Sequence, residues 1–140
     1  MKKAGILLLT LTLCFALTSC GNPGTDMSYS SLESFSEAEI KSAEDTVRAM
    51  FRDAFKGCEL RKLWYEEMKS DAAAEFYQTN GRGSVNGAKK ENVIVLFSDF
   101  YVDASGGDGI LNLDSIYYDW QWFLIKDDAN SEWELSDWGY

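Results

Sequence analysis

The chain has 140 residues, of which 13 are Lys or Arg and 23 are Asp or Glu, and its formal net charge is −10. An acidic chain repels nucleic acid and anionic lipid headgroups, so we expect no nucleic-acid partner. The sequence contains no histidine, which excludes Ser-His-Asp and Cys-His nucleophilic sites, histidine general bases and the usual zinc, copper and non-haem iron sites. We therefore expect no metal and no cofactor.

The first nineteen residues have the layout of a secretory signal peptide. Two lysines precede an apolar run over 4–17, which is shorter than the roughly 20 residues that a membrane-spanning helix needs. The run is followed by LTSC at 17–20, which resembles the lipobox of bacterial lipoproteins, where a diacylglyceryl group is added to the cysteine sulfur and the chain is cut before it. We predict that residues 1–19 are a lipoprotein signal peptide and that Cys20 is the lipidation site.

This prediction places the mature protein at the cell membrane, on its extracytoplasmic face, held by acyl chains such as palmitate on Cys20. The alternatives are an ordinary signal peptide with a chance cysteine, or a buried apolar helix. Cys14 would be removed with the signal, which leaves Cys58 as the one internal cysteine. No intramolecular disulfide can then form. With no histidine to activate it, we expect Cys58 to be a buried structural thiol.

The mature chain divides into a tether and one domain. We predict a lipid-anchored flexible tether over 20–35, because GNPGTDMSYSSL at 21–32 is rich in glycine, serine and turn formers and holds the single proline. The remaining residues are enough for a hydrophobic core without disulfides. Since no repeat and no second linker interrupts them, we predict a single domain over 36–140.

The first element of this domain is a predicted amphipathic helix over about 37–56. Ser36 and Glu39 have the spacing of a capping box. Apolar residues recur at three- and four-residue steps along one face, and Gly57 is placed to end the helix. Such a helix lays one apolar face on a flat partner.

A sheet supplies that partner. A strand is predicted over 58–67, with a bulge near Arg61 because the apolar alternation changes phase there. A short helix capped by Ser70 follows, and strands are then predicted over 93–103, 115–126 and 133–140. The last three strands can pair as an antiparallel meander. One long helix on such a sheet is an α+β fold.

The long helix, the strand GCELRKLWY (57–65) and the paired ending WQWFLIKDD (120–128) and SEWELSDWGY (131–140) resemble the cone-shaped α+β domains of the nuclear transport factor two-like, or cystatin-like, superfamily. They also resemble lipoproteins of unknown function from gut Firmicutes that carry such a domain. The resemblance implies a helix packed on a curved antiparallel sheet, with a pocket open at one end. It implies no single activity, because the superfamily includes isomerases, dehydratases, polyketide cyclases and members that only bind or pair.

Two strand aspartates are the candidate catalytic residues. Asp99 interrupts an apolar strand and has Phe97 and Tyr101 on its face, and Asp119 follows Tyr117 on a mixed face. In isomerase relatives, a strand aspartate buried beside a tyrosine transfers protons, because burial raises its pKa. No motif anchors that role here. The alternative is that both aspartates point to solvent.

Alternation over 115–126 predicts that Tyr118, Trp120 and Trp122 share one face of their strand. Exposed aromatic residues would form a stacking surface for sugars or aromatic ligands, or a docking patch for a protein. The alternative, which we prefer, is that large rings fill the space between sheet and helix. The five tryptophans on predicted strands are Trp64, Trp120, Trp122, Trp133 and Trp138.

The acidic loops at 103–109 and 127–132 lack the ligand spacing of a calcium-binding EF-hand loop and are expected to be turns. The sequence therefore favours a lipid-anchored, non-catalytic module that binds a small molecule, glycan or protein partner. The alternative is an isomerase- or dehydratase-like enzyme that uses Asp99 or Asp119 as a proton shuttle. A homodimer formed by sheet pairing is compatible with either hypothesis.

Overall fold

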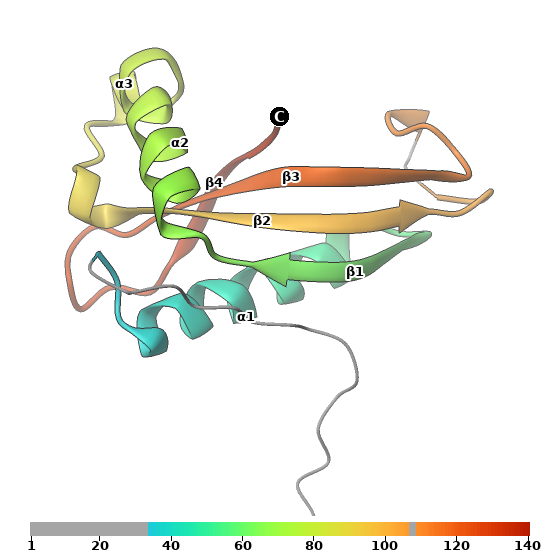
Figure 1. Cartoon of the computed structure of the whole chain (residues 1–140), viewed down its shortest axis with the longest axis horizontal. Coiled ribbons are helices and arrows are strands. Elements are labelled where there is room, and N and C mark those ends of the chain that lie inside the picture. The colour runs from blue at the N-terminus through green and yellow to red at the C-terminus, as the bar shows by residue number, and fades with distance from the viewer. Residues whose placement is uncertain (1–33, 107–108) are drawn as a thin grey trace, which may run out of the picture.

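The computed structural model describes residues 34–106 and 109–140. The predicted signal peptide, the lipidation site at Cys20 and nearly all of the tether lie outside these residues. The described chain forms a four-stranded antiparallel sheet with helix α1 on one face and helix α2 on the other (Figure 1). The predicted α+β class is confirmed. No helix in the described ranges is long and apolar enough to cross a membrane.

Helix α1 (Glu37–Ala54) begins at a capping box. The Ser36 hydroxyl accepts a hydrogen bond from the Glu39 amide at 3.3 Å, and the Glu39 carboxylate accepts one from the Ser36 amide at 3.0 Å. Beyond the C-cap, Gly57 has a φ of +69° and packs on the backbone of Gly106, so a side chain at Gly57 would overlap that backbone. The start of the helix is thus set by local chemistry, and the turn after it by close packing of Gly57 on Gly106.

Glu39 also fixes the start of α1 to the sheet. Its carboxylate lies 2.7 Å from Nζ of Lys126, whose side chain is only 4% exposed. The Trp133 indole donates to the Glu39 carbonyl oxygen at 3.1 Å. The hydrogen bond from Lys126, together with that from the Ser36 amide, lowers the pKa of Glu39 to about 2. The carboxylate therefore stays charged beside its buried cation.

The strands are β1 (Cys58–Trp64), β2 (Val93–Val102), β3 (Ser115–Ile125) and β4 (Glu134–Gly139). They lie in the order β1-β2-β3-β4, and each pairs antiparallel with the next, so the predicted meander is confirmed. The predicted bulge in β1 is also confirmed, because the register shifts between Leu60 and Lys62.

Helix α2 (Glu67–Asn80) is longer than predicted, and the prediction that Ser70 caps it was wrong. The N-cap is Glu66, and Ser70 is buried one turn inside the helix. Its hydroxyl accepts a hydrogen bond from the Val95 amide at 3.0 Å. Since the pairing of β1 with β2 stops at Phe97, this amide lies beyond β1, and the serine satisfies it instead.

A second layer therefore covers part of the sheet face opposite α1. Ala74 and Tyr77 of α2 pack on Val93, Val95 and Phe97 of β2. Helix α3 (Gly83–Asn86) and the short 3-10 helix η1 (Lys90–Asn92) connect α2 to β2. In Figure 1, α2 crosses one end of this face, and the strands extend well beyond it.

The larger core lies between α1 and the sheet. Trp120, Trp122 and Trp133 are buried there, which confirms the preferred prediction for these three tryptophans. Trp64 is half-buried on the other face, and Trp138 is exposed. The space under α1 is filled by side chains of α1 and of the strands, of which the largest fully buried are Ile40, Val47, Leu63, Ile94, Leu96, Phe100, Val102, Trp122 and Leu124.

Candidate functional site

Asp99 lies where two irregularities of the sheet meet. It pairs with Lys62, next to the bulge in β1, and on the other side the register with β3 shifts between Ser98 and Phe100. One residue of β2 there opposes two of β3, Tyr118 and Asp119.

The bulge in β3 is completed by Asp99 itself. Asp119 has a φ of +53°, in the left-handed region that residues other than glycine seldom adopt. Its amide donates to Oδ1 of Asp99 at 3.1 Å. A polar residue interrupts this apolar strand because its carboxylate accepts a hydrogen bond from the amide that the bulge displaces.

This bulge reverses the alternation of side chains along β3. Tyr117 lies on the α1 side, where its ring stacks on Phe100 at 5.1 Å and meets Trp120 edge-on at 5.5 Å. Tyr118 is 57% exposed. The prediction that Tyr118 shares a face with Trp120 was therefore wrong, because one extra residue moves every later side chain to the other face.

The structure brings the two predicted aspartates together in a shallow depression of about 440 Å³, here called the polar hollow. The Asp119 side chain is 64% exposed and lies 3.7 Å from Nζ of Lys69. Proton transfer near neutral pH needs a desolvated carboxyl, and the carboxyl of Asp119 is exposed to solvent. The polar hollow is lined by Lys62, Trp64, Tyr65, Glu66, Lys69, Asp99, Tyr118 and Asp119.

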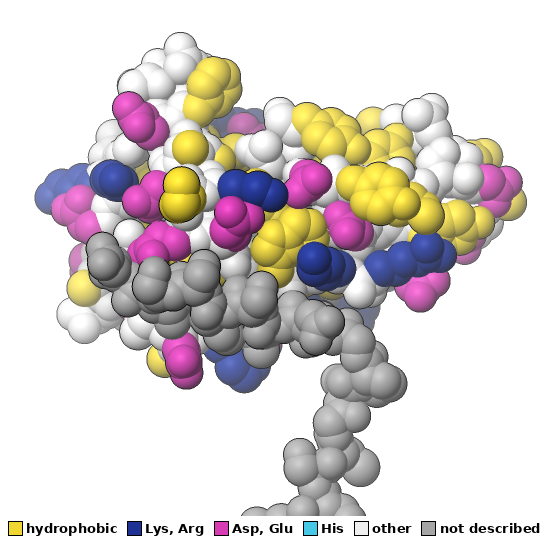
Figure 2. Space-filling model, viewed as in Figure 1, with side chains coloured by type: hydrophobic (Ala, Val, Ile, Leu, Met, Phe, Trp, Pro, Cys, Tyr) yellow, Lys and Arg dark blue, Asp and Glu magenta, His cyan; other side chains and the backbone are white. Residues whose placement is uncertain are grey.

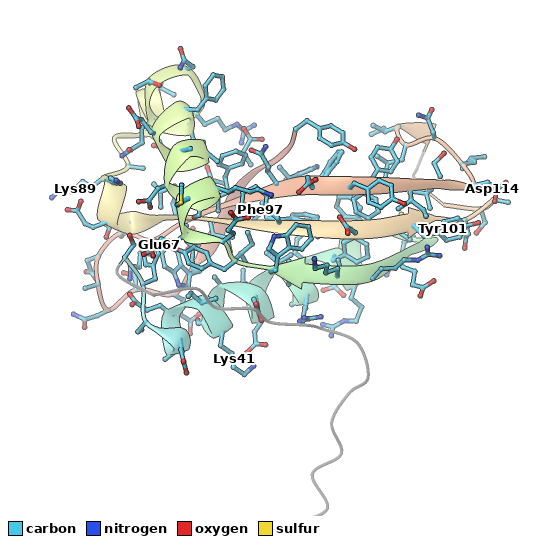
Figure 3. All side chains as sticks on the ribbon, viewed as in Figure 1. Lys41, Glu67, Lys89, Phe97, Tyr101 and Asp114 are labelled. Carbon is cyan, nitrogen blue, oxygen red and sulfur yellow. The ribbon has the colours of Figure 1, made fainter. Side chains whose placement is uncertain are left out.

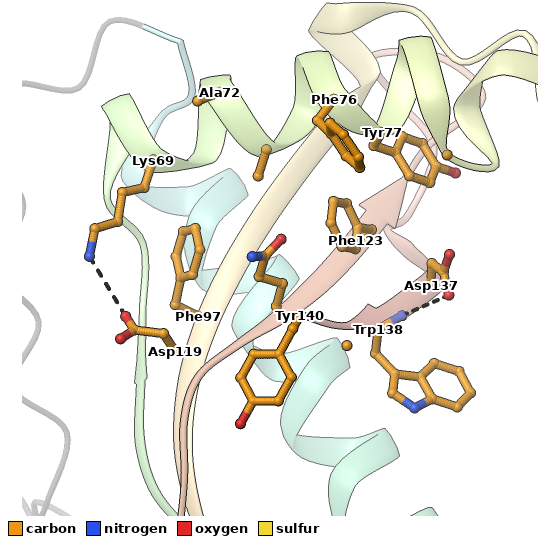
Figure 4. Close-up of a pocket in the computed structure, with 14 residues that line it drawn as sticks. Lys69, Ala72, Phe76, Tyr77, Phe97, Asp119, Phe123, Asp137, Trp138 and Tyr140 are labelled. Atoms are coloured by element: carbon orange, nitrogen blue, oxygen red, sulfur yellow. Dashed lines mark hydrogen bonds and ion pairs between the residues drawn. The ribbon is translucent and has the colours of Figure 1, made fainter.

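A larger cavity of about 800 Å³, here called the aromatic groove, lies between α2 and the strands β3 and β4 (Figure 4). It shares Lys69 and Asp119 with the polar hollow. It is lined by Lys69, Ala72, Ala73, Phe76, Tyr77 and Gly81 beside α2, by Phe97, Gln121 and Phe123 of the sheet, and by Asp119, Asp137, Trp138, Gly139 and Tyr140.

Small residues and aromatic rings together give the aromatic groove its shape. Ala72 and Ala73 line the groove between Lys69 and Phe76, and their small side chains leave space beside α2. Phe76 and Tyr140 stand on opposite sides of the groove (Figure 4), and they are 65% and 75% exposed. Phe97 lies beside α2 on the sheet (Figure 3). Phe97 is buried against α2, whereas Phe76 and Tyr140 offer apolar surface that the protein itself leaves uncovered.

The charged groups of the aromatic groove are paired. The Lys69–Asp119 pair lies on one side of it, and Asp137 lies on the other (Figure 4). Asp137 is 3.9 Å from Arg82, which also donates to the Ser136 carbonyl oxygen at 3.0 Å. On this face, hydrophobic side chains are interspersed with acidic and basic ones over the strands beside α2 (Figure 2).

Gln121 differs from these charged groups. Its side-chain amide lines the aromatic groove and has no hydrogen-bond partner within the described residues. A primary amide carries two N–H donors and one oxygen acceptor, so Gln121 offers both kinds of hydrogen bond to an occupant of the groove.

Hydrogen bonds at Asp103 and Asp128 form turns within the described parts of the two acidic loops. Asp103 accepts hydrogen bonds from the amide and hydroxyl of Ser105, both at 2.7 Å, and these bonds lower the pKa of Asp103. Asp128 accepts one from the Asn130 amide at 2.8 Å. Across 34–106 and 109–140, no three Cys, Asp or Glu side chains are grouped so as to hold a metal ion. Cys58 is half-buried at the margin of the α1-side core.

These observations define an α+β domain with an open, aromatic-lined groove on one face of its sheet. The sequence profile of the family described as Domain of unknown function (DUF4829) matches residues 30–139, and the chain belongs to this family. No curated protein and no solved structure matches the chain. The matched range holds helices α1 and α2 and strands β1 to β4.

We expect Asp99→Ala to lower the free energy of unfolding by about 1.5–3 kcal/mol, the range for a hydrogen bond to a charged group, because the Asp119 amide loses its acceptor. Asp119→Gly keeps the amide and suits the left-handed conformation, so its stability should stay within about 1 kcal/mol of the parent. Urea denaturation of the full chain measures both. Asp99→Asn, which retains an oxygen acceptor, is the control, and equal losses in Asp99→Ala and Asp119→Gly would contradict this role.

Proposed function

We propose that the protein is a lipid-anchored, extracytoplasmic binding module without catalytic activity, whose ligand enters the aromatic groove. The groove supports this most strongly. Its volume of about 800 Å³ lies within the roughly 300–1,000 Å³ of ligand pockets, which are lined mainly by apolar and aromatic side chains with a few polar groups. The candidate ligands are a small molecule, a glycan or a segment of a partner protein.

Binding fits the groups around the groove better than catalysis does. Lys69 and Asp119 neutralise each other at the surface, Asp137 lies beside Arg82, and Asp99 is engaged by the backbone. Acid–base catalysis near neutral pH needs a desolvated carboxyl, and the Asp119 side chain is mostly exposed. The alternative of an isomerase- or dehydratase-like enzyme with Asp99 or Asp119 as proton shuttle therefore has less support.

The anchoring half of the proposal is supported by the sequence at 1–20, where a basic start, an apolar run and LTSC succeed one another. In the same proposal, the domain is a relative of the nuclear transport factor two-like superfamily. Its long amphipathic helix α1 would pack on a curved, cone-like sheet. The order of a helix followed by an antiparallel sheet supports this kinship.

Cys20→Ser should abolish incorporation of an alkyne-labelled palmitate in bacterial cells and move the protein out of the membrane fraction, because no sulfur remains to carry the lipid. Fluorescence of the labelled band and immunoblots of cell fractions measure the two effects. Cys14→Ser lies inside the predicted signal and is the matched control, which should keep both label and location. Retention of label by Cys20→Ser would contradict the anchor.

The groove is tested with the full chain in lipid nanodiscs. Neutral disaccharides, aromatic amino acids and short apolar peptides are added in turn, and amide chemical shifts are recorded by NMR. We expect at least one probe to shift resonances of Ala73, Gln121 and Gly139, since these residues line the groove.

Ala72→Trp places a large ring in the groove, and it should weaken the binding of that probe at least tenfold, or about 1.4 kcal/mol. Ala54→Trp adds the same ring at an exposed position of α1 and should leave the binding unchanged. Shifts confined to other surfaces, or equal affinities of the two variants, would overturn the assignment of the groove.

A further inference from the structure

We propose that the ligand of the aromatic groove is a neutral oligosaccharide, which lies along the open face of the sheet over the groove and the polar hollow together. This inference rests on the proposed function and names its ligand class. Three observations carry it: the two cavities share two lining residues, they hold no excess of positive charge, and each contains exposed rings together with hydrogen-bonding groups.

The contiguity comes from the Lys69–Asp119 pair, which lines both cavities. Its atoms are 3.7 Å apart, and both side chains are more than half exposed. Exposed ion pairs of this kind contribute little to stability, so a ligand can separate or bridge these groups at small cost. An elongated ligand can therefore continue from the aromatic groove into the polar hollow.

The charges argue against an anionic ligand. The two cavities together contain the cations Lys62 and Lys69, while their carboxylates are Glu66, Asp99, Asp119 and Asp137. Lys69 is already shared between Glu66, at 3.3 Å, and Asp119. No excess of positive charge is therefore present to compensate a phosphate, a sulfate or a uronic acid. A neutral ligand meets no such penalty.

The remaining groups match the chemistry of sugars. A pyranose has apolar C–H faces that pack on aromatic rings and hydroxyl groups that both donate and accept hydrogen bonds. Exposed rings stand in both cavities, with Phe76 and Tyr140 in the groove and Tyr118 in the hollow. The Gln121 amide and the carboxylates of Asp119 and Asp137 lie between or beside them. A ligand without hydrogen-bonding groups would leave the Gln121 amide without a partner.

The test uses the full chain in lipid nanodiscs and an array of neutral and anionic oligosaccharides of two to six sugar units. We expect binding to neutral oligosaccharides, with calorimetric affinity that rises from two to about four units as the ligand reaches the second cavity, and none to anionic ones. Gln121→Leu should weaken the binding of oligosaccharides of every length, because the groove loses a side-chain amide that no described residue engages.

Tyr118→Ala tests the polar hollow independently of the aromatic groove, because Tyr118 lines only the hollow. It should weaken the longer chains about tenfold, the scale of one aromatic contact, and leave the disaccharide unchanged. Ile116→Ala is the matched control, because Ile116 is also exposed on β3 and lies outside the lining of both cavities. Equal effects on short and long chains, or an affinity that does not grow with length, would overturn the extended site.

The two proposals fail in different ways. If no neutral oligosaccharide binds while amino acids or apolar peptides shift the resonances of the groove, the ligand class is wrong and the binding groove stands. Preference for anionic oligosaccharides would likewise overturn the ligand class. If Ala72→Trp has no effect on any probe, the groove itself is not the site.

Discussion

The hydrogen bond from the Asp119 amide to the Asp99 carboxylate determines which side chains of β3 face each layer of the molecule. It holds an extra residue in the strand and so places Tyr117 against the α1-side core and Tyr118 on the open face. The backbone of Asp119 has a left-handed conformation, and its carboxylate lies beside Lys69 of α2. The boundary between the aromatic groove and the polar hollow follows from this one contact.

The two faces of the sheet are used differently. Under α1, aromatic and branched side chains fill the space, and the ion pair between Glu39 and the buried Lys126 fixes the helix to the turn between β3 and β4. On the other face, α2 covers only one end of the strands (Figure 1). A helix with alanines toward the sheet and an exposed phenylalanine at its edge leaves a groove rather than a second closed core. The closed face holds the larger core, and the open face leaves apolar side chains exposed.

Elements with local signals were predictable from the sequence. The capping box at Ser36 and the bulge near Arg61 were found because neighbouring residues carry the whole pattern. The bulge at Asp119 was missed because aromatic residues occupy both faces of β3 and hide the change of phase, and because its partner Asp99 is twenty residues away. Serine is common at helix N-caps, so Ser70 was predicted to be one. It bonds the Val95 amide instead, because β1 ends before it can pair with Val95. The lining of the groove was not predicted either, because its walls come from α2, β3 and β4, which are far apart in the sequence.

The central claim is that the bulge at Asp119 assigns the side chains of β3 to their faces, and fluorine NMR of the full chain labelled with 3-fluorotyrosine tests it most directly. Replacement of single tyrosines by phenylalanine assigns the signals, and a soluble paramagnetic agent then reports the exposure of each ring. With the bulge in place, the Tyr118 signal should broaden strongly, while Tyr117, packed on Phe100 and Trp120, should broaden much less. Strict alternation along β3 gives the opposite order, and a Tyr117 signal that broadens as much as that of Tyr118 would contradict the account.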